Sequence, residues 1–180
     1  KVNIVFTGTI YHEHQDFHLI LDALSRLKKE SRNHIRLSLF GINHDYAINL
    51  ARQYNVEDIV LNKGEVDFRQ AVAIQQKADL LLLLLFKESD AYGVLPGKLF
   101  EYLGARRPLV VTGDRNDDDI CALVRSHNAG DVYTCPEHLC HALEGAVRKK
   151  IFNKEPLPPV KESDHRSLFR SEQFKKIEAL

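Results

Sequence analysis

The sequence has no excess of charge of either sign, because its 180 residues include 25 lysines and arginines against 25 aspartates and glutamates. Domains that bind nucleic acids usually carry a basic excess, so the balance argues against that class. Cysteine is also scarce, with three residues and no CxxC spacing. An odd and scattered set does not fit a disulfide framework and favours a reducing, cytoplasmic compartment.

Long apolar runs and targeting signals are missing as well. The longest apolar run, residues 80–86, is far too short to cross a bilayer and predicts a buried strand instead. No signal peptide is recognisable. The chain begins at Lys1 without a methionine and enters a strand almost at once, so we expect a fragment of a longer protein. A signal, an anchor or a whole domain is therefore not excluded.

Several motifs of common enzymes are absent too. The sequence contains no GxSxG elbow, no GxGxxG dinucleotide fingerprint and no GxxxxGK[ST] loop, and no internal repeat is evident. These absences argue against a serine hydrolase, an NAD enzyme and a P-loop NTPase. Cys135 directly precedes a proline, which is typical of the start of a helix rather than of a nucleophile.

What the chain does contain is a regular alternation of strands and helices. Apolar periodicity predicts strands at residues 2–8, 35–40, 59–61, 80–85, 109–112 and 131–133. It predicts helices at residues 17–29, 45–54, 67–77, 96–103, 117–127 and 136–150. Such βα units with short loops predict an α/β fold of one domain: a Rossmann-like, doubly wound parallel sheet with helices on both faces.

The domain is expected to occupy residues 1–152. The proline-rich segment NKEPLPPV, residues 153–160, is predicted to be a connector, and residues 166–177 a last helix, so 153–180 form a separate C-terminal part. In open α/β sheets ligands bind at the carboxyl ends of the strands. The corresponding loops lie at residues 8–12, 40–43, 62–66, 86–98 and 112–116.

Residues 93–110, GVLPGKLFEYLGARRPLV, carry the most informative motif. A loop rich in glycine and proline leads into a helix, whose unpaired N–H groups and positive dipole end suit a phosphate. The positive charge of Lys98 in the first turn is unfavourable beside the positive end of the helix dipole, unless an anion compensates for it. Glu101 follows one turn later on the same face, where it could accept hydrogen bonds from a sugar diol, remain solvated, or pair with Arg106 or Arg107.

This motif resembles the nucleotide-sugar-binding, C-terminal half of GT-B-fold glycosyltransferases in the large retaining family of the group 1 type. The resemblance extends, in order and spacing, over FTGTIY (6–11), LSLFG (37–41), LNKGEV (61–66), KADLLLLLL (77–85) and LPGKLFEYLGARRPLV (95–110). Many members carry two glutamates with seven residues between them. Glu101 matches the second, which implies the ribose-binding role. Gly93 holds the place of the first, and Glu88 and Asp90 do not match its spacing. A subgroup with the proline–glycine–lysine form shows the same loss.

The resemblance implies a donor site in which Lys98 neutralises the leaving phosphates and Glu101 grips ribose. It implies no metal and no cofactor, because the nucleotide-sugar, of the UDP or GDP type, is a substrate. Backbone around residues 62–66 would face the base. The expected donor-binding residues are Gly8, Thr9, Gly41, Gly64, Val66, Gly93, Val94, Leu95, Gly97, Lys98 and Glu101.

The loop after the first strand carries weaker signals. Gly8 and Thr9 form either a plain tight turn or a close backbone approach to a phosphate. Related sequences often place a basic residue soon afterwards, whereas here residues 11–14 read YHEH. His12, His14 and His18, with Glu13 and Asp16, also suggest a metal, but their spacings fit no single backbone conformation, so we expect a solvated loop.

The resemblance thus implies a hexosyl transfer to a glycan, lipid or small-molecule acceptor held by a missing N-terminal domain, without which the fragment would be inactive. The full-length enzyme is expected in the cytoplasm, with peripheral association at the inner face of the membrane left open. Two alternatives remain: a nucleotide-sugar 2-epimerase half-domain and a non-catalytic α/β interaction module. The base, the sugar, the acceptor, the stereochemical outcome and the oligomeric state are not indicated by the sequence.

Overall fold

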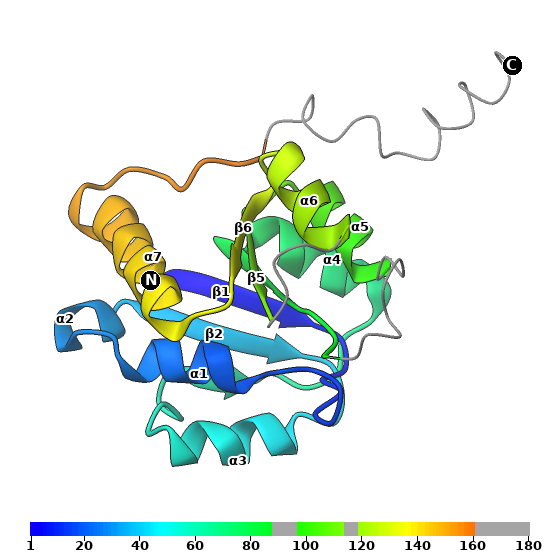
Figure 1. Ribbon diagram of the computed structural model, residues 1–180, viewed down its shortest axis with the longest axis horizontal. Coiled ribbons are helices and arrows are strands. Elements are labelled where there is room, and N and C mark those ends of the chain that lie inside the picture. The colour runs from blue at the N-terminus through cyan, green and yellow to red at the C-terminus, as the bar shows by residue number, and fades with distance from the viewer. Residues whose placement is uncertain (88–96, 114–118, 161–180) are drawn as a thin grey trace, which may run out of the picture.

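Six parallel strands form one twisted sheet in the computed structural model, which describes residues 1–87, 97–113 and 119–160 (Figure 1). Their order across the sheet is β3-β2-β1-β4-β5-β6. The strands are β1 (Val2–Thr7), β2 (Ile35–Phe40), β3 (Val60–Asn62), β4 (Leu80–Leu84), β5 (Leu109–Thr112) and β6 (Gly130–Tyr133). Each lies within one residue of the predicted range, and the predicted α/β fold is confirmed.

Helices cover both faces of the sheet, as predicted (Figure 1). One face carries α1 (His18–Ser25), α3 (Asp45–Gln53) and α7 (Pro136–Val147), and the other carries α4 (Phe68–Lys77), α5 (Gly97–Ala105) and α6 (Asp119–Ser126). Two shorter elements, α2 (Lys29–Arg32) and η2 (Arg148–Phe152), follow α1 and α7.

The leucine run of β4 is shared between two hydrophobic cores. Leu80, Leu82 and Leu84 belong to the core under α1, α3 and α7. Leu81, Leu83 and Leu85 belong to the core under α5 and α6. A strand buried on both faces must be apolar at every position, because successive side chains point to opposite sides. Burial of each leucine contributes about 1.5–3 kcal/mol, so β4 anchors the centre of the sheet.

Two predicted helices differ from those observed. The helix predicted at residues 17–29 is interrupted, because Lys28 is extended and its backbone N–H donates to Glu144 Oε1 of α7 at 3.2 Å. This tertiary contact replaces a helical hydrogen bond, and periodicity alone does not reveal it. The helix predicted at 136–150 ends at Val147 and continues in the wider turns of η2, where Asn153 N donates to Arg148 O.

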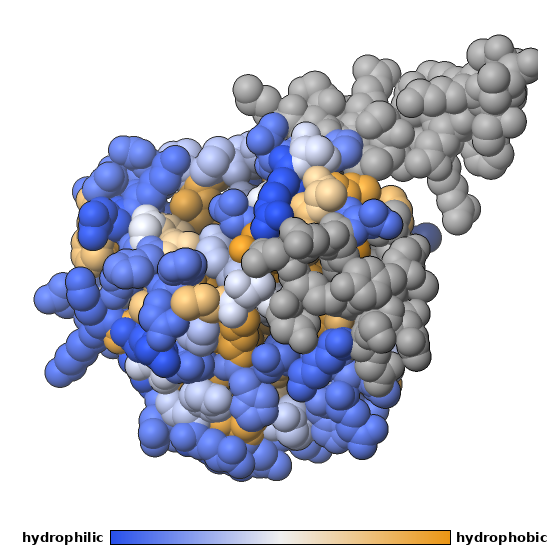
Figure 2. Space-filling model, viewed as in Figure 1, coloured by the Kyte–Doolittle hydropathy of each residue, from blue (hydrophilic) through white to orange (hydrophobic). Residues whose placement is uncertain are grey.

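The segment after η2 returns to the domain. Val160 is buried in the second core, and its N–H donates to Arg106 O at 3.1 Å. The boundary predicted between residues 152 and 153 remains a prediction, and the helix predicted at 166–177 lies outside the described residues. Within the described ranges no helix is long and apolar enough to cross a membrane. The face shown in Figure 2 is largely hydrophilic, with apolar areas that are small and separated.

The strand order places a topological switch point between β1 and β4. From β1 the chain builds outward through β2 to β3, then crosses to β4 and builds in the other direction to β6. Neighbouring loops at the carboxyl ends of β1 and β4 therefore diverge to opposite faces and leave a crevice, which is where ligands bind in this architecture.

Candidate functional site

A cavity of about 300 Å³ opens at the carboxyl ends of β1 and β2, beside the start of α5. It brings together six of the residues predicted to bind a donor, although they come from four separate segments: Gly8, Thr9, Gly41, Val66, Lys98 and Glu101. The remaining lining residues are Thr7, Phe40, Ile42, Glu65, Phe68 and Ala71.

A second cavity, of about 340 Å³, lies on the other side of Lys98. Gly8, Thr9 and Lys98 line both cavities, and Gly97, the first residue of α5, lines this one. Because Leu84 and Phe86 form its opposite wall, it occupies the crevice between β1 and β4. The two cavities thus share Gly8, Thr9 and Lys98, and we treat them together as the candidate site.

Of the other four predicted donor-site residues, Gly64 is described and three are not. Gly64 lines neither cavity, but its carbonyl accepts a hydrogen bond from Gly41 N at 2.8 Å and so helps to hold the β2 turn. Gly93, Val94 and Leu95 lie outside the described residues. The predicted loop–helix motif is therefore seen from Gly97 onward.

Lys98 and Glu101 form an ion pair between the two cavities. The distance from Lys98 Nζ to Glu101 Oε2 is 2.7 Å, and the side chains are 29% and 30% exposed. Gln75 Nε2 donates to the same oxygen at 3.2 Å. Among the described residues Glu101 Oε1 has no hydrogen-bond partner, so one carboxylate oxygen is fixed while the other remains able to accept. The anion that the lysine needs at the start of α5 is thus supplied, at least in part, by Glu101.

The Lys98 side chain runs across Gly8. A Cβ atom on Gly8 would lie 3.5 Å from Lys98 Cε and 4.0 Å from Nζ, and the backbone φ of +124° is one that other residues rarely adopt. The glycine therefore permits both the turn after β1 and the approach of the lysine to it.

A buried polar network supports this pair, and the sequence analysis missed it. Gln75, fully buried on α4, also donates to Thr7 Oγ1 at 2.9 Å, and Thr7 N donates to Tyr102 OH at 2.9 Å. Burial raises the pKa of Tyr102 to about 12, so its hydroxyl is neutral near pH 7. One sequence feature could have indicated Gln75: it lies one turn after Ala71, on the face of the predicted helix that turns toward the sheet.

His44 is a second residue that the sequence analysis missed. It precedes α3, is 1% exposed, and its Nε2 lies 2.8 Å from Gly8 O. Its ring meets Phe6 edge to face, with centroids 6.1 Å apart. Nδ1 is buried and has no hydrogen-bond partner within the described part of the chain. The ligand-binding loop predicted at residues 40–43 ends one residue before His44.

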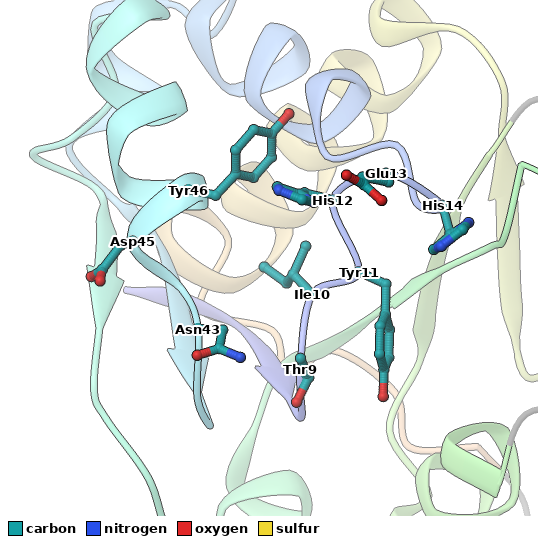
Figure 3. A pocket seen from close by; sticks show the side chains of 9 residues that line it. All are labelled: Thr9, Ile10, Tyr11, His12, Glu13, His14, Asn43, Asp45 and Tyr46. Atoms are coloured by element: carbon teal, nitrogen blue, oxygen red, sulfur yellow. The ribbon is translucent and has the colours of Figure 1, made fainter.

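A third cavity, of about 510 Å³, adjoins Thr9 between the β1–α1 loop and the start of α3 (Figure 3). His12 lies edge-on against Tyr46, with centroids 4.8 Å apart, whereas His14 points to the opposite side (Figure 3). Across residues 1–87, 97–113 and 119–160, no three His, Cys, Asp or Glu side chains gather in a way that could hold a metal ion. The side chains here diverge rather than converge on one point (Figure 3).

Comparison with known proteins gives a consistent result. The family model described as glycosyl transferases group 1 matches residues 1–150. The search among curated proteins gives no match. WaaG, a glycosyltransferase involved in lipopolysaccharide biosynthesis, has a TM-score of 0.61 at 17% identity over 91% of this chain and 46% of its own. The lipopolysaccharide outer core galactosyltransferase WaaB has a TM-score of 0.64 at 17% identity over 98% of this chain and 48% of its own.

HepE from Anabaena, solved in complex with UDP, has a TM-score of 0.66 at 12% identity over 98% of this chain and 49% of its own. At these identities the likeness shows the fold, which is that of one domain of the GT-B glycosyltransferases. The chain spans about half the length of these solved structures. Because the family model covers most of its residues, the chain belongs to the glycosyl transferases group 1 family.

Proposed function

We propose that this chain is the donor-binding domain of a glycosyltransferase and that it holds the nucleoside diphosphate of a nucleotide-sugar. The observation that carries the proposal is the Lys98–Glu101 pair, which stands at the start of α5 and at the switch point of the sheet. A cation and a hydrogen-bond acceptor at that place match the two parts shared by all such donors, a diphosphate and a ribose. The UDP bound to HepE, which has the same fold, supports this proposal.

Glu101 would bind the ribose. Gln75 and Lys98 hold Oε2, which leaves Oε1 able to accept hydrogen bonds from a ligand. A carboxylate accepts hydrogen bonds and donates none, so it suits vicinal hydroxyl groups, which both donate. The buried Gln75 makes this orientation rigid before the donor arrives, and a preorganised group loses less free energy on binding.

Lys98 would neutralise the diphosphate. Its ammonium carries three hydrogens, and the contact to Glu101 uses only one of them. Gly97 and Lys98, at the start of α5, and Gly8 and Thr9, after β1, line the same crevice, where their N–H groups would be available to a phosphate. When the sugar–phosphate bond breaks, negative charge develops on the leaving diphosphate, and fixed positive groups there would lower the barrier.

The base would lie against the β3–α4 segment. Val66 and Phe68 line the cavity that contains Glu101, and Phe68 is 70% exposed although it is a large aromatic side chain. A planar base could cover this ring, which would remove apolar surface from water.

In the whole enzyme a second domain would hold the acceptor, and a hexosyl group would pass to it across the interdomain cleft, in the cytoplasm. None of the three cysteines takes part in a disulfide in the structure, which agrees with a reducing compartment. The family match favours a transferase over the 2-epimerase and over a plain interaction module.

The proposal is tested by isothermal titration of the chain with UDP, GDP and ADP. At least one should bind, weakly because part of the cleft is missing. Lys98→Ala should weaken the binding by about tenfold to a hundredfold and flatten its salt dependence, since a charge-assisted contact is lost. Lys77→Ala is the matched control, because Lys77 is an exposed cation in the last turn of α4 and lines neither cavity. No heat with any nucleotide at millimolar concentration, together with no thermal shift, would rule the proposal out.

A further inference from the structure

We propose that His44 is a positioning residue of the donor site, which fixes the peptide between Gly8 and Thr9 so that the Thr9 N–H faces the crevice between β1 and β4. This inference rests on the proposed function, because the crevice is where the diphosphate would lie. His44 itself lines neither of the two cavities and would act only through the backbone.

The hydrogen bond from His44 to Gly8 determines the direction of one carbonyl group. Nε2 lies 2.8 Å from Gly8 O, and because a carbonyl oxygen can only accept, the ring nitrogen carries the hydrogen. The ring cannot move easily, since it is buried, meets Phe6 edge to face, and belongs to the residue that caps α3. The Gly8 carbonyl is therefore tied to a rigid part of the domain.

This carbonyl points toward the β2 side of the sheet. A Cβ atom on Gly41, the residue after β2, would lie 2.2 Å from Gly8 O. The C=O and N–H of a planar trans peptide point in opposite directions. Since β1 lies between β2 and β4, the Thr9 N–H must point toward β4 and the start of α5.

The neighbouring amide on that side confirms the geometry. Thr7 N, two residues earlier, donates toward α5, to Tyr102 OH at 2.9 Å. The Thr9 N–H, by contrast, meets no acceptor among the described residues, although Thr9 lines the crevice with Lys98. An amide that is oriented and unpaired beside a lysine is the donor that a phosphate oxygen requires.

The orientation depends on His44 because Gly8 does not hold it alone. Glycine adopts positive and negative φ with similar ease, so the turn at φ +124° could rotate without the hydrogen bond. The other ring nitrogen, Nδ1, is buried without a partner among the described residues, which is unfavourable. An apolar side chain would fill the same place without the cost of an unpaired buried nitrogen. The favourable contribution of the ring therefore comes from the hydrogen bond of Nε2 to Gly8 O.

The test compares His44→Leu, which keeps an apolar side chain but removes the donor, with His44→Gln, whose Nε2 can still reach Gly8 O. Each is titrated with inorganic pyrophosphate, with the nucleoside diphosphate among UDP, GDP and ADP that binds the wild type most tightly, and with its nucleoside. His44→Leu should weaken the two phosphate ligands by about tenfold, the effect of one charge-assisted hydrogen bond, and leave the nucleoside within about twofold. His44→Gln should restore most of the loss.

A second measurement uses the wild type, so that the test survives if His44→Leu does not fold. In ¹⁵N–¹H spectra the Thr9 amide should shift strongly on addition of pyrophosphate. An unmoved Thr9 amide, or a loss in His44→Leu that is equal for nucleoside and diphosphate, overturns the role of His44. A wild type that binds none of the three nucleoside diphosphates overturns the donor site itself, which is a different and separately visible failure.

Discussion

At the scale of single residues, we expect the Lys98–Glu101 pair to contribute more to ligand binding than to stability. Both side chains are about 30% exposed, and ion pairs in such positions typically add no more than about 1 kcal/mol to folding. Their value lies in geometry, because each fixes the other at the start of α5. Removing one should therefore change ligand binding more than the melting temperature.

Glu101→Gln should weaken binding of the nucleoside diphosphate by about tenfold to a hundredfold. The amide has one accepting oxygen, and its NH₂ then faces a ribose hydroxyl that also donates. Pyrophosphate lacks ribose, so its affinity should stay the same or rise, since Lys98 no longer shares its charge. Titration of both ligands checks this.

Glu65→Gln is the matched control for that variant, because Glu65 lines the same cavity and loses the same charge. It lacks the fixed orientation that Gln75 and Lys98 give to Glu101. An equal loss in both variants, or an equal loss of nucleotide and pyrophosphate in Glu101→Gln, would contradict the ribose assignment.

The residues of the site differ in how far the sequence reveals them. Lys98 and Glu101 follow from one continuous segment, whose loop, helix and spacing are legible without a structure. Gln75, Tyr102 and His44 act through partners 68, 95 and 36 positions away along the chain. No local pattern encodes such contacts, and they become visible only when β1, α4 and α5 are placed together.

At the scale of elements, the turns after β1 and β2 are packed directly against each other. Gly8 N donates to Phe40 O at 2.7 Å, and Gly41 lies against Gly8 O. The sequence shows a glycine at the end of each of these strands, but it does not show that the two turns pack against each other. The sequence likewise does not show the interruption of the helix after α1, where the Lys28 N–H donates to Glu144 of α7. Periodicity reports which face of an element is buried, not which distant group meets its backbone.

Gly41→Ala should destabilise the domain much more than Gly64→Ala. Both glycines have positive φ, so both substitutions strain the backbone, by about 1 kcal/mol. At Gly64 nothing lies within 4 Å of the added Cβ, whereas at Gly41 it would meet Gly8 O at 2.2 Å and must displace the β1 turn. We expect an additional loss of about 1–3 kcal/mol for Gly41→Ala from overpacking, measured by urea unfolding. Equal urea midpoints for the two variants would show that the β1 turn can move aside without a loss of stability.

At the scale of the whole molecule, the parallel sheet and its two covered faces follow from the alternation of βα units. The extended connection back to the domain does not. Val160 enters the second core beside α5, and a valine within NKEPLPPV shows no periodicity that would predict its burial. The domain thus closes its second face partly with residues that the sequence assigns to a connector.

The stability of the whole domain should fall at alkaline pH. Burial raises the pKa of both Tyr102 and Tyr133 to about 12, and the nearby Asp131 adds to the effect at Tyr133. In the unfolded chain a tyrosine titrates near pH 10. The folded state therefore retains protons that the unfolded state loses, so this contribution is complete below pH 10 and is lost as the pH rises from 10 to 12.

Tyr102→Phe isolates one part of this dependence. At pH 8 it should cost about 1 kcal/mol, because Thr7 N loses its acceptor. Between pH 10 and 12 the free energy of unfolding of Tyr102→Phe should decline less steeply than that of the wild type. The two slopes should differ by up to about 1.4 kcal/mol per pH unit, because the variant lacks one group that keeps its proton in the folded state and loses it in the unfolded state. Tyr133→Phe should flatten the same window in the same way, without the loss at Thr7. Urea titrations at pH 8, 10 and 11 measure all three proteins, and parallel declines in wild type and Tyr102→Phe would mean that the buried hydroxyl titrates as it does in water.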